Sequence, residues 1–182
     1  MKNLILFSLL VVCHSHGYAQ QESHLDVHSM DGAHRVTLGL AHTHISTGRI
    51  HEKTEWLTAP SWSLNYDYWI SDQWAVGLQN DLIIETFLIE NTEGEEVERE
   101  FPIAIVPVAI FKPGKHFSFI GGIGAEFAAS GNLTLTRFGG EYGLLLDGQW
   151  EVGISLVWDN AWNHYNSWGL GFTVSKLFAR KH

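Results

Sequence analysis

The stretch WSLNYDYWI, residues 62–70, alternates large apolar side chains with smaller polar ones. Successive side chains of a strand point to opposite faces, so this pattern predicts a strand with one apolar and one polar face. Residues 150–159 and 167–178 repeat the alternation, and each apolar face carries aromatic residues at or near an end. Past residue 33 no window keeps a helical apolar spacing. The body of the chain is therefore predicted to be all-β.

Turn residues divide this body into eight predicted strands. They lie near residues 34–45, 60–70, 74–89, 101–112, 116–128, 133–146, 149–158 and 166–178. The connections at 71–73, 113–114 and 147–148 are tight, whereas those at 46–59, 90–100 and 159–165 are longer and polar. An even strand number, with short turns at one end and long loops at the other, is typical of outer-membrane barrels. We predict an all-β, eight-stranded antiparallel up-and-down transmembrane β-barrel over residues 34–178, with a short tail at 179–182.

The first nineteen residues are organised like a secretory signal peptide. Lys2 precedes a short apolar run at residues 4–12, and Gly17 and Ala19 lie three and one residues before a cut after Ala19. The only cysteine, Cys13, lies inside this segment, so the mature chain can form no disulfide. Residues 1–19 are predicted to be removed. Residues 20–33 then form a His-rich flexible periplasmic segment before the barrel.

Composition and charge narrow the class of protein. A chain of 182 residues with 45% hydrophobic and 17% charged residues fits one folded domain. Its net charge is −9, and loss of Lys2 with the signal leaves 10 basic against 20 acidic residues, a net charge of −10. Such a surface repels nucleic-acid phosphates, so nucleic-acid partners are not expected.

The two faces of the strands favour a membrane barrel over a soluble one. One face of most strands is apolar with terminal aromatic residues, as in the girdles of membrane barrels, and the other consists of Gly, Ser, Thr and a few acids. A soluble lipocalin-like ligand binder, which has an apolar interior and a charged coat, remains an alternative. Residues 101–111 fit worst, because they are apolar on both faces and contain Pro107; we expect a bulge there.

The chain resembles a known family, the small bacterial outer-membrane β-barrels similar to the membrane domain of outer membrane protein A, and in particular short His-rich barrel proteins. The resemblance rests on the signal, on His24 and His28, on the stretch YDYWISDQWAVGL at residues 66–78 and on the Trp-rich last hairpin. It covers about residues 20–182. It implies a bacterial outer-membrane location and a barrel fold, with outer-membrane lipids as partners, and it implies no activity. The chain departs from the family in the four residues that follow Phe178, because many such barrels end on an aromatic residue.

Histidines near the first strand could hold a transition metal. His24, His28 and His34 precede or begin it, and neutral imidazoles bind zinc, copper or nickel. Their spacing matches no closed zinc motif. Solvated tail histidines are the simpler interpretation. A periplasmic accessory barrel that binds a divalent metal is a minority hypothesis, and no cofactor is expected.

A lipid A-modifying hydrolase is the third alternative. Outer-membrane lipid A deacylases use a His and a Ser two residues apart near the outer rim, with a carboxylate nearby. His42, His44 and Ser46 share the apolar face at the outer end of the first strand by parity. No partner carboxylate can be identified on that face. The chain is therefore not expected to be an enzyme.

Two further segments have plain structural interpretations. Residues 90–100 contain six acids and one base, which indicates a solvated external loop, with a cation or partner site as the alternative. Residues 121–124 read Gly-Gly-Ile-Gly inside a predicted strand, without a following helix. We expect these glycines to thin the wall or to accommodate a lumen side chain.

The lumen is predicted to contain a charge network around Arg137. A turn centred between Ser130 and Gly131 would place Glu126 opposite Leu135 and diagonal to Arg137. A three-residue turn with a left-handed Gly148 would place Arg137 opposite Asp159, and Glu141 opposite Ser155. Arg137 would then be the one central base, shared among Glu126, Glu141 and Asp159.

Eight strands enclose an interior just wide enough for side chains, so an open pore is not expected. The favoured function is a structural or interaction role in the outer membrane.

Overall fold

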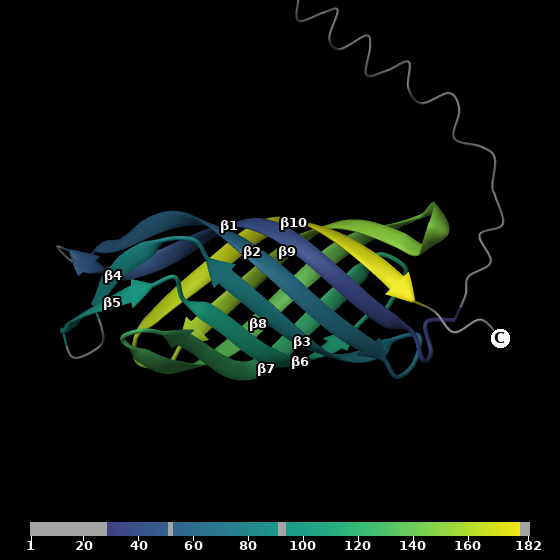
Figure 1. Ribbon diagram of the computed structural model, residues 1–182, viewed down its shortest axis with the longest axis horizontal. Coiled ribbons are helices and arrows are strands. Elements are labelled where there is room, and N and C mark those ends of the chain that lie inside the picture. Colours follow the sequence, from purple (N-terminus) through teal and green to yellow (C-terminus); the bar gives the residue numbers. More distant parts are fainter. Residues whose placement is uncertain (1–28, 51–52, 91–93, 179–182) are drawn as a thin grey trace, which may run out of the picture.

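The computed structural model describes residues 29–50, 53–90 and 94–178, and it shows a closed barrel of eight antiparallel strands (Figure 1). The barrel strands are β1 (His34–Ile50), β2 (Lys53–Trp69), β3 (Trp74–Ile83), β6 (Ile103–Phe111), β7 (Phe117–Ala128), β8 (Gly131–Leu146), β9 (Trp150–Ala161) and β10 (Tyr165–Phe178). Each strand pairs with the next one of this series, and β1 pairs with β10 to close the sheet. The all-β, eight-stranded, up-and-down prediction is confirmed. No helix among the described residues is long and apolar enough to cross a bilayer.

On most strands the apolar face lies outside and the polar face inside, as the alternation predicts; β6 is the exception, because its inward Val106, Val108 and Ile110 are apolar too. Leu64 and Phe172 are exposed on the outer wall, whereas Thr37, Asp67 and Ser175 are buried within the barrel. A lipocalin-like barrel would have the opposite arrangement, with charges outside. The exterior also carries rings of aromatic residues towards the two ends of its apolar band; they include Trp62, Tyr66, Tyr68, Trp74, Phe117, Tyr142, Trp150, Trp158 and Trp168.

The strands extend further than predicted at the long-loop end. β1 and β2 continue to pair as far as Ser46 and Trp56, with a register shift after that, so most of residues 46–59 are strand and not loop. β9 and β10 leave only residues 162–164 as a turn, although residues 159–165 were predicted to be a longer loop. Beyond the apolar band both faces of a strand can be polar. Such composition resembles that of a loop, which explains the error.

The segment between β3 and β6 forms a separate hairpin. The strand predicted over 74–89 ends at Ile83, and a bend leads into β4 (Thr86–Glu90), which pairs with β5 (Glu96–Glu100). Both strands lie at the end of the barrel opposite the start of β1 and the end of β10 (Figure 1). Part of the predicted external loop is therefore a strand. Its exposed Glu96, Glu98 and Glu100 alternate with side chains that point inwards.

No bulge occurs at Pro107. The pairing of β6 with β7 skips Val106 and Pro107 and resumes in the same register, so no extra residue is present. Instead, the neighbouring glycines let the two backbones approach. A Cβ on Gly122 would lie 2.2 Å from the Pro107 carbonyl oxygen, and one on Gly124 would lie 2.3 Å from the Ile105 carbonyl oxygen. The glycines at 122 and 124 therefore accommodate backbone and are not only a thinning of the wall.

Candidate functional site

Buried charges fill the barrel interior in three groups along its axis. We call them the inner cluster, at the short-turn end, the central cluster, and the outer cluster, at the end of the β4–β5 hairpin. Some ion pairs join neighbouring strands, such as Arg35 with Asp67, and others join strands that lie apart in the sheet and so cross the lumen, such as Arg137 with Asp81. The inner cluster contains Arg35, Asp67, Lys112, Glu141 and Glu151; the central one Gln79, Asp81, Arg137 and Asp159; the outer one Arg99, Glu126 and Tyr165.

The inner cluster is centred on Arg35 of β1, which is 2% exposed. Its Nε lies 2.9 Å from Asp67 of β2, and its Nη1 lies 3.2 Å from Glu141 of β8 and 3.1 Å from Glu151 of β9. Lys112 donates to the second oxygen of Glu151 at 3.1 Å. Both cations lie over the Trp69 ring, whose centroid is 5.8 Å from the Arg35 guanidinium carbon and 5.6 Å from the Lys112 Nζ. Two bases and three acids thus share one enclosed volume, and one guanidinium joins β1 to three other strands.

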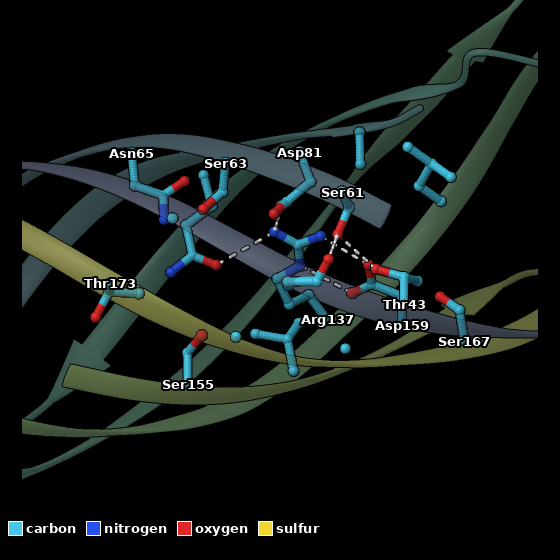
Figure 2. A pocket seen from close by; sticks show the side chains of 18 of the residues that line it. Thr43, Ser61, Ser63, Asn65, Asp81, Arg137, Ser155, Asp159, Ser167 and Thr173 are labelled. Carbon is cyan, nitrogen blue, oxygen red and sulfur yellow. Dashed lines mark hydrogen bonds and ion pairs between the residues drawn. The ribbon is translucent and has the colours of Figure 1, made fainter. Parts of the chain in front are cut away.

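The central cluster is centred on Arg137 of β8 (Figure 2). Its Nε and Nη2 bind the two oxygens of Asp159 at 2.8 and 2.7 Å, a bidentate pair that fixes the guanidinium plane. Its Nη1 donates to Asp81 on the far strand β3 and to the Gln79 side-chain oxygen at 3.3 Å. The guanidinium therefore connects β8 and β9 with the opposite wall.

A small polar cavity lies beside the central cluster. Its volume is about 60 Å³, and Figure 2 shows Ser61, Ser63, Asn65 and Thr173 around it. At about 10–15 Å³ per water, this volume has room for roughly four to six water molecules. It is far smaller than the several hundred Å³ of a typical small-molecule site. The central lumen is therefore suited to water and not to a substrate.

The outer cluster joins the hairpin to the mouth of the barrel. Arg99 of β5 is fully buried and donates to Glu126 at 3.0 and 2.6 Å, to the Ser130 hydroxyl at 3.1 Å and to the Gly131 carbonyl at 2.8 Å. The Tyr165 hydroxyl donates to the second oxygen of Glu126. Tyr165 precedes the apolar band of β10, and burial together with the Glu126 carboxylate raises its pKa above the ordinary value. The hydroxyl of Tyr165, already protonated at neutral pH, therefore stays a donor at higher pH as well.

An apolar contact supports the same junction. The inner face of the hairpin packs on residues at the mouth of the barrel, with Phe87 edge-on to the Tyr165 ring at a centroid distance of 5.9 Å. This apolar group contains Ile45, Ala59, Ile83, Phe87, Ile89, Leu133, Ala161 and Tyr165. Together with the Arg99 bonds, it places the hairpin over the outer end of the lumen.

Comparison with solved structures identifies the architecture. The attachment invasion locus protein Ail of Yersinia pestis superposes with a TM-score of 0.53 at 15% identity, covering 80% of this chain and 99% of that protein. Neisserial surface protein A superposes with a TM-score of 0.54 at 9% identity, with the same coverage of 80% and 99%. This is the fold of small outer-membrane β-barrels. No protein-family model matches the chain, and no curated protein matches it either.

Within this outer-membrane barrel fold, the charge network differs from the predicted one. The structure pairs Arg137 with Asp159, and places Glu141 with Arg35 in the inner cluster and Glu126 with Arg99 in the outer one. Three bases, and not one, pair with these acids, and a fourth, Lys112, pairs with Glu151. The excess negative charge expected around a single arginine is therefore distributed among three separate groups.

The turns explain which pairings were predicted well. β8 and β9 turn through residues 147–149 with Gly148 at φ 71°, so Arg137 opposes Asp159 and Glu141 opposes Ser155, as predicted. β7 and β8 instead turn through residues 129 and 130, because Ala128 pairs with Gly131. Glu126 therefore opposes Leu133 and not Leu135. This shift by two residues keeps Glu126 on the lumen face and removes it from Arg137.

The histidine hypothesis gains no support from the described residues. His24 and His28 lie outside them, and His34 is exposed with its Nδ1 2.6 Å from the Tyr66 hydroxyl. No group of three or more His, Cys, Asp or Glu side chains within the described ranges could hold a metal ion. Metal binding by His24, His28 and His34 stays an untested prediction.

The hydrolase hypothesis lacks its third residue in the described part of the chain. His44 stacks on the Trp168 ring at 3.9 Å, and its Nδ1 lies 2.9 Å from the Thr58 hydroxyl. A hydrolase would need a carboxylate in the position that Thr58 occupies, to orient the imidazole. Ser46 pairs across the sheet with Trp56, which supplies no acid. The outward histidine therefore has the environment of an aromatic girdle.

Sequence reasoning missed three lumen bases: Arg35, Arg99 and Lys112. The alternation of the strand could have placed Arg35 inside. Arg35 shares one face of the strand with Thr37 and Gly39, and the apolar Val36 and Leu38 lie on the other face. Arg99 was assigned to a solvated loop. Lys112 ends the predicted strand 101–112 and shares the parity of the buried Val108 and Ile110, but that strand is apolar on both faces, so its sequence did not show which face points inwards.

Proposed function

We propose that this chain loses residues 1–19 and inserts into the outer membrane of a bacterium as a closed barrel whose outer end binds an extracellular partner. The fold likeness to known outer-membrane barrels and the apolar, aromatic-ringed exterior support the membrane location. The lipids of that membrane would cover the apolar band. The short-turn end, with the start of β1 and the end of β10, would face the periplasm.

One observation carries the non-conducting part of the proposal: ion pairs cross the lumen at three levels. Arg35 ties β1 to β8 and β9, Arg137 ties β8 to β3, and Arg99 ties the hairpin to β7. The cavity of about 60 Å³ between them cannot hold a continuous hydrated ion path. The barrel is therefore proposed to be an anchor for its outer end and not a channel.

The outer end has the features of a binding surface. β1 and β2 run past the apolar band, and the β4–β5 hairpin is held in a defined position by Arg99. In another structure, Ail is in complex with the heparin analogue sucrose octasulfate, at a TM-score of 0.54 and 14% identity. A sulfated ligand is not proposed for this chain, because the glutamates exposed on its β5 strand repel sulfate groups.

Fractionation and single-channel recording test the proposal. The protein should be found with outer membranes, should begin at Gln20 by N-terminal sequencing, and should migrate differently on SDS gels before and after boiling. Purified barrels in planar bilayers should give no stable conductance. A soluble periplasmic protein would overturn the location, and a steady open-channel current would overturn the closed lumen.

A further inference from the structure

The outer half of β2 has an edge that no described strand covers. β2 pairs with β3 only between Ser61 and Trp69, and beyond that a single bond joins the Ile84 N–H to the Pro60 carbonyl at 2.9 Å. β1 covers the other edge of β2 as far as Trp56. β4 pairs only with β5, so it diverges from β2 after Pro60. We call the space between the outer half of β2 (residues 55–60) and the hairpin the β2–β4 gap.

Strand geometry indicates which backbone groups of β2 line the β2–β4 gap. In an antiparallel strand, alternate residues point their N–H and C=O groups to the same edge. The Pro60 carbonyl points towards β3, so the N–H and C=O groups of Thr58 and Trp56 point to the same side. These four groups have no β-ladder partner there among the described strands. An exposed strand edge of this kind is a template for a further strand.

The β2–β4 gap forms a groove with a volume of about 610 Å³. It is lined on the β2 side by Glu55 and Trp56, and on the hairpin side by Glu85, Leu88 and Glu98. Trp56 is 49% and Leu88 55% exposed, which offers apolar surface beside the three carboxylates. None of these carboxylates forms an ion pair with another described side chain. The groove is thus acidic, partly apolar and bordered by a free strand edge.

We propose that an extended peptide segment with alternating cationic and apolar side chains, from an extracellular protein, binds this groove by adding a strand to the free edge of β2. The inference rests on the proposed function, since it names the partner of the outer end. Backbone bonds to Thr58 and Trp56 give the segment its register. Its Lys or Arg side chains meet Glu55, Glu85 and Glu98, and its apolar side chains contact Trp56 and Leu88.

Other occupants fit the groove less well. A second copy of this chain would bring the same three carboxylates against their equivalents, and like charges in contact are unfavourable. A sulfated glycan is repelled for the same reason. A divalent cation would satisfy the carboxylates and leave the strand edge and the exposed Trp56 unused.

The test uses the full mature chain, refolded in a zwitterionic detergent, and the acetylated heptapeptide Lys-Val-Lys-Val-Lys-Val-Lys as the probe. Two N-methylated forms, one blocking the lysine amides and one the valine amides, serve as controls for strand addition. Because only alternate amides face the edge, one form should bind about tenfold more weakly, from the loss of roughly two hydrogen bonds, and the other should bind like the probe. The probe should also slow hydrogen exchange of the Trp56 and Thr58 amides.

Matched variants locate the site. Glu55→Gln with Glu98→Gln removes two groove carboxylates and should weaken binding about tenfold. Glu90→Gln with Glu96→Gln removes the same charge from exposed hairpin positions outside the groove, and should change affinity less than about twofold. The difference between the two pairs should shrink in high salt.

Each other outcome overturns the inference. Equal binding of both N-methylated forms means adsorption by charge alone, and equal effects of the two variant pairs mean no localised site. Binding weaker than millimolar means no site for this segment. Self-association of the chain without peptide, with the same amides protected, means that a second copy uses the edge. None of these results changes the outer-membrane location or the absence of conductance, so failure of the peptide is distinguishable from failure of the proposed function.

Discussion

Arg35 offers the most demanding test of the closed lumen. Arg35→Ala removes the one guanidinium that, among the residues the structure describes, contacts Asp67, Glu141 and Glu151, whose side chains are 1%, 7% and 3% exposed. Removing one partner of a buried ion pair costs about 3–5 kcal/mol, because the remaining charge stays buried without compensation. Three acids lose a partner here and only Glu151 keeps another, Lys112. The free energy of unfolding should therefore fall by about 5 kcal/mol, the upper end of that range.

A double variant separates charge from packing. Asp67 depends most on Arg35, since its other oxygen has no hydrogen-bond partner among the described residues. Arg35→Ala with Asp67→Asn should therefore recover about 2 kcal/mol of the loss, by removing one stranded charge. Lys112→Ala should cost only about 2 kcal/mol, because Glu151 keeps Arg35.

Guanidinium titration of the refolded barrel in detergent, followed by tryptophan fluorescence, measures these values. The four proteins should unfold with similar slopes and different midpoints. A loss below about 1 kcal/mol for Arg35→Ala, or a double variant no more stable than the single one, would refute the argument that this guanidinium compensates the inner cluster.

Three further outcomes are expected. Arg137→Ala should lower the free energy of unfolding by about 3 kcal/mol in the same titration. This is less than for Arg35→Ala, because Asp81 and Asp159 are 29% and 18% exposed beside the cavity. Adding Asp81→Asn to Arg137→Ala should restore part of the loss, and adding Glu126→Gln should restore none. Arg99→Ala should make the β4–β5 hairpin sensitive to protease, while the unfolding midpoint of the barrel changes little, since Glu126 becomes hydrated when the hairpin moves away. Gly124→Ala should cost about 1–3 kcal/mol, from the clash with the Ile105 carbonyl, whereas Gly121→Ala, whose new Cβ meets nothing closer than 3.8 Å, should stay within about 0.5 kcal/mol by thermal or denaturant unfolding.

The face on which a side chain lies could be predicted from the sequence. Side chains alternate between the two faces with a period of two along the strand, whichever residues of the neighbouring strand they pair with. Arg137, Glu126, Glu141 and Asp159 were all assigned to the lumen by parity, and all face it. The pairing of Arg137 with Asp159 followed from one glycine, because a left-handed residue at 148 admits few hairpin geometries. The turn through residues 129 and 130 is followed by Gly131, which also has a positive φ of 128°, but the sequence did not show where in the hairpin this glycine lies. A shift by two residues there changed the partner of Glu126 and left its face unchanged.

Contacts across the lumen could not be predicted in the same way. Arg35 and Glu151 are 116 residues apart in sequence and meet only because the barrel closes through β10, which pairs with β1 on one side and with β9 on the other. Parity gives the direction of a side chain and not its height along the axis, which depends on the stagger of all intervening strands. Arg99 was hidden for another reason, since the alternation of β5 is masked by an acidic run that resembles a loop.

The free edge of β2 and the closed lumen have a common origin in the seam between β2 and β3. Paired rungs there include Ser63 with Asp81 and Tyr66 with Leu78, and between them side chains replace the ladder: the Asn80 N–H donates to Asn65 Oδ1 at 3.1 Å, and Asn80 Nδ2 donates to the Leu64 carbonyl at 2.8 Å. The ladder then resumes in the same register and ends with the Ser61–Ile83 pair. β3 leaves β2 at Pro60, and the chain continues into the hairpin, where Arg99 meets Glu126. The same divergence that closes the mouth of the barrel also exposes the edge of β2 to a partner.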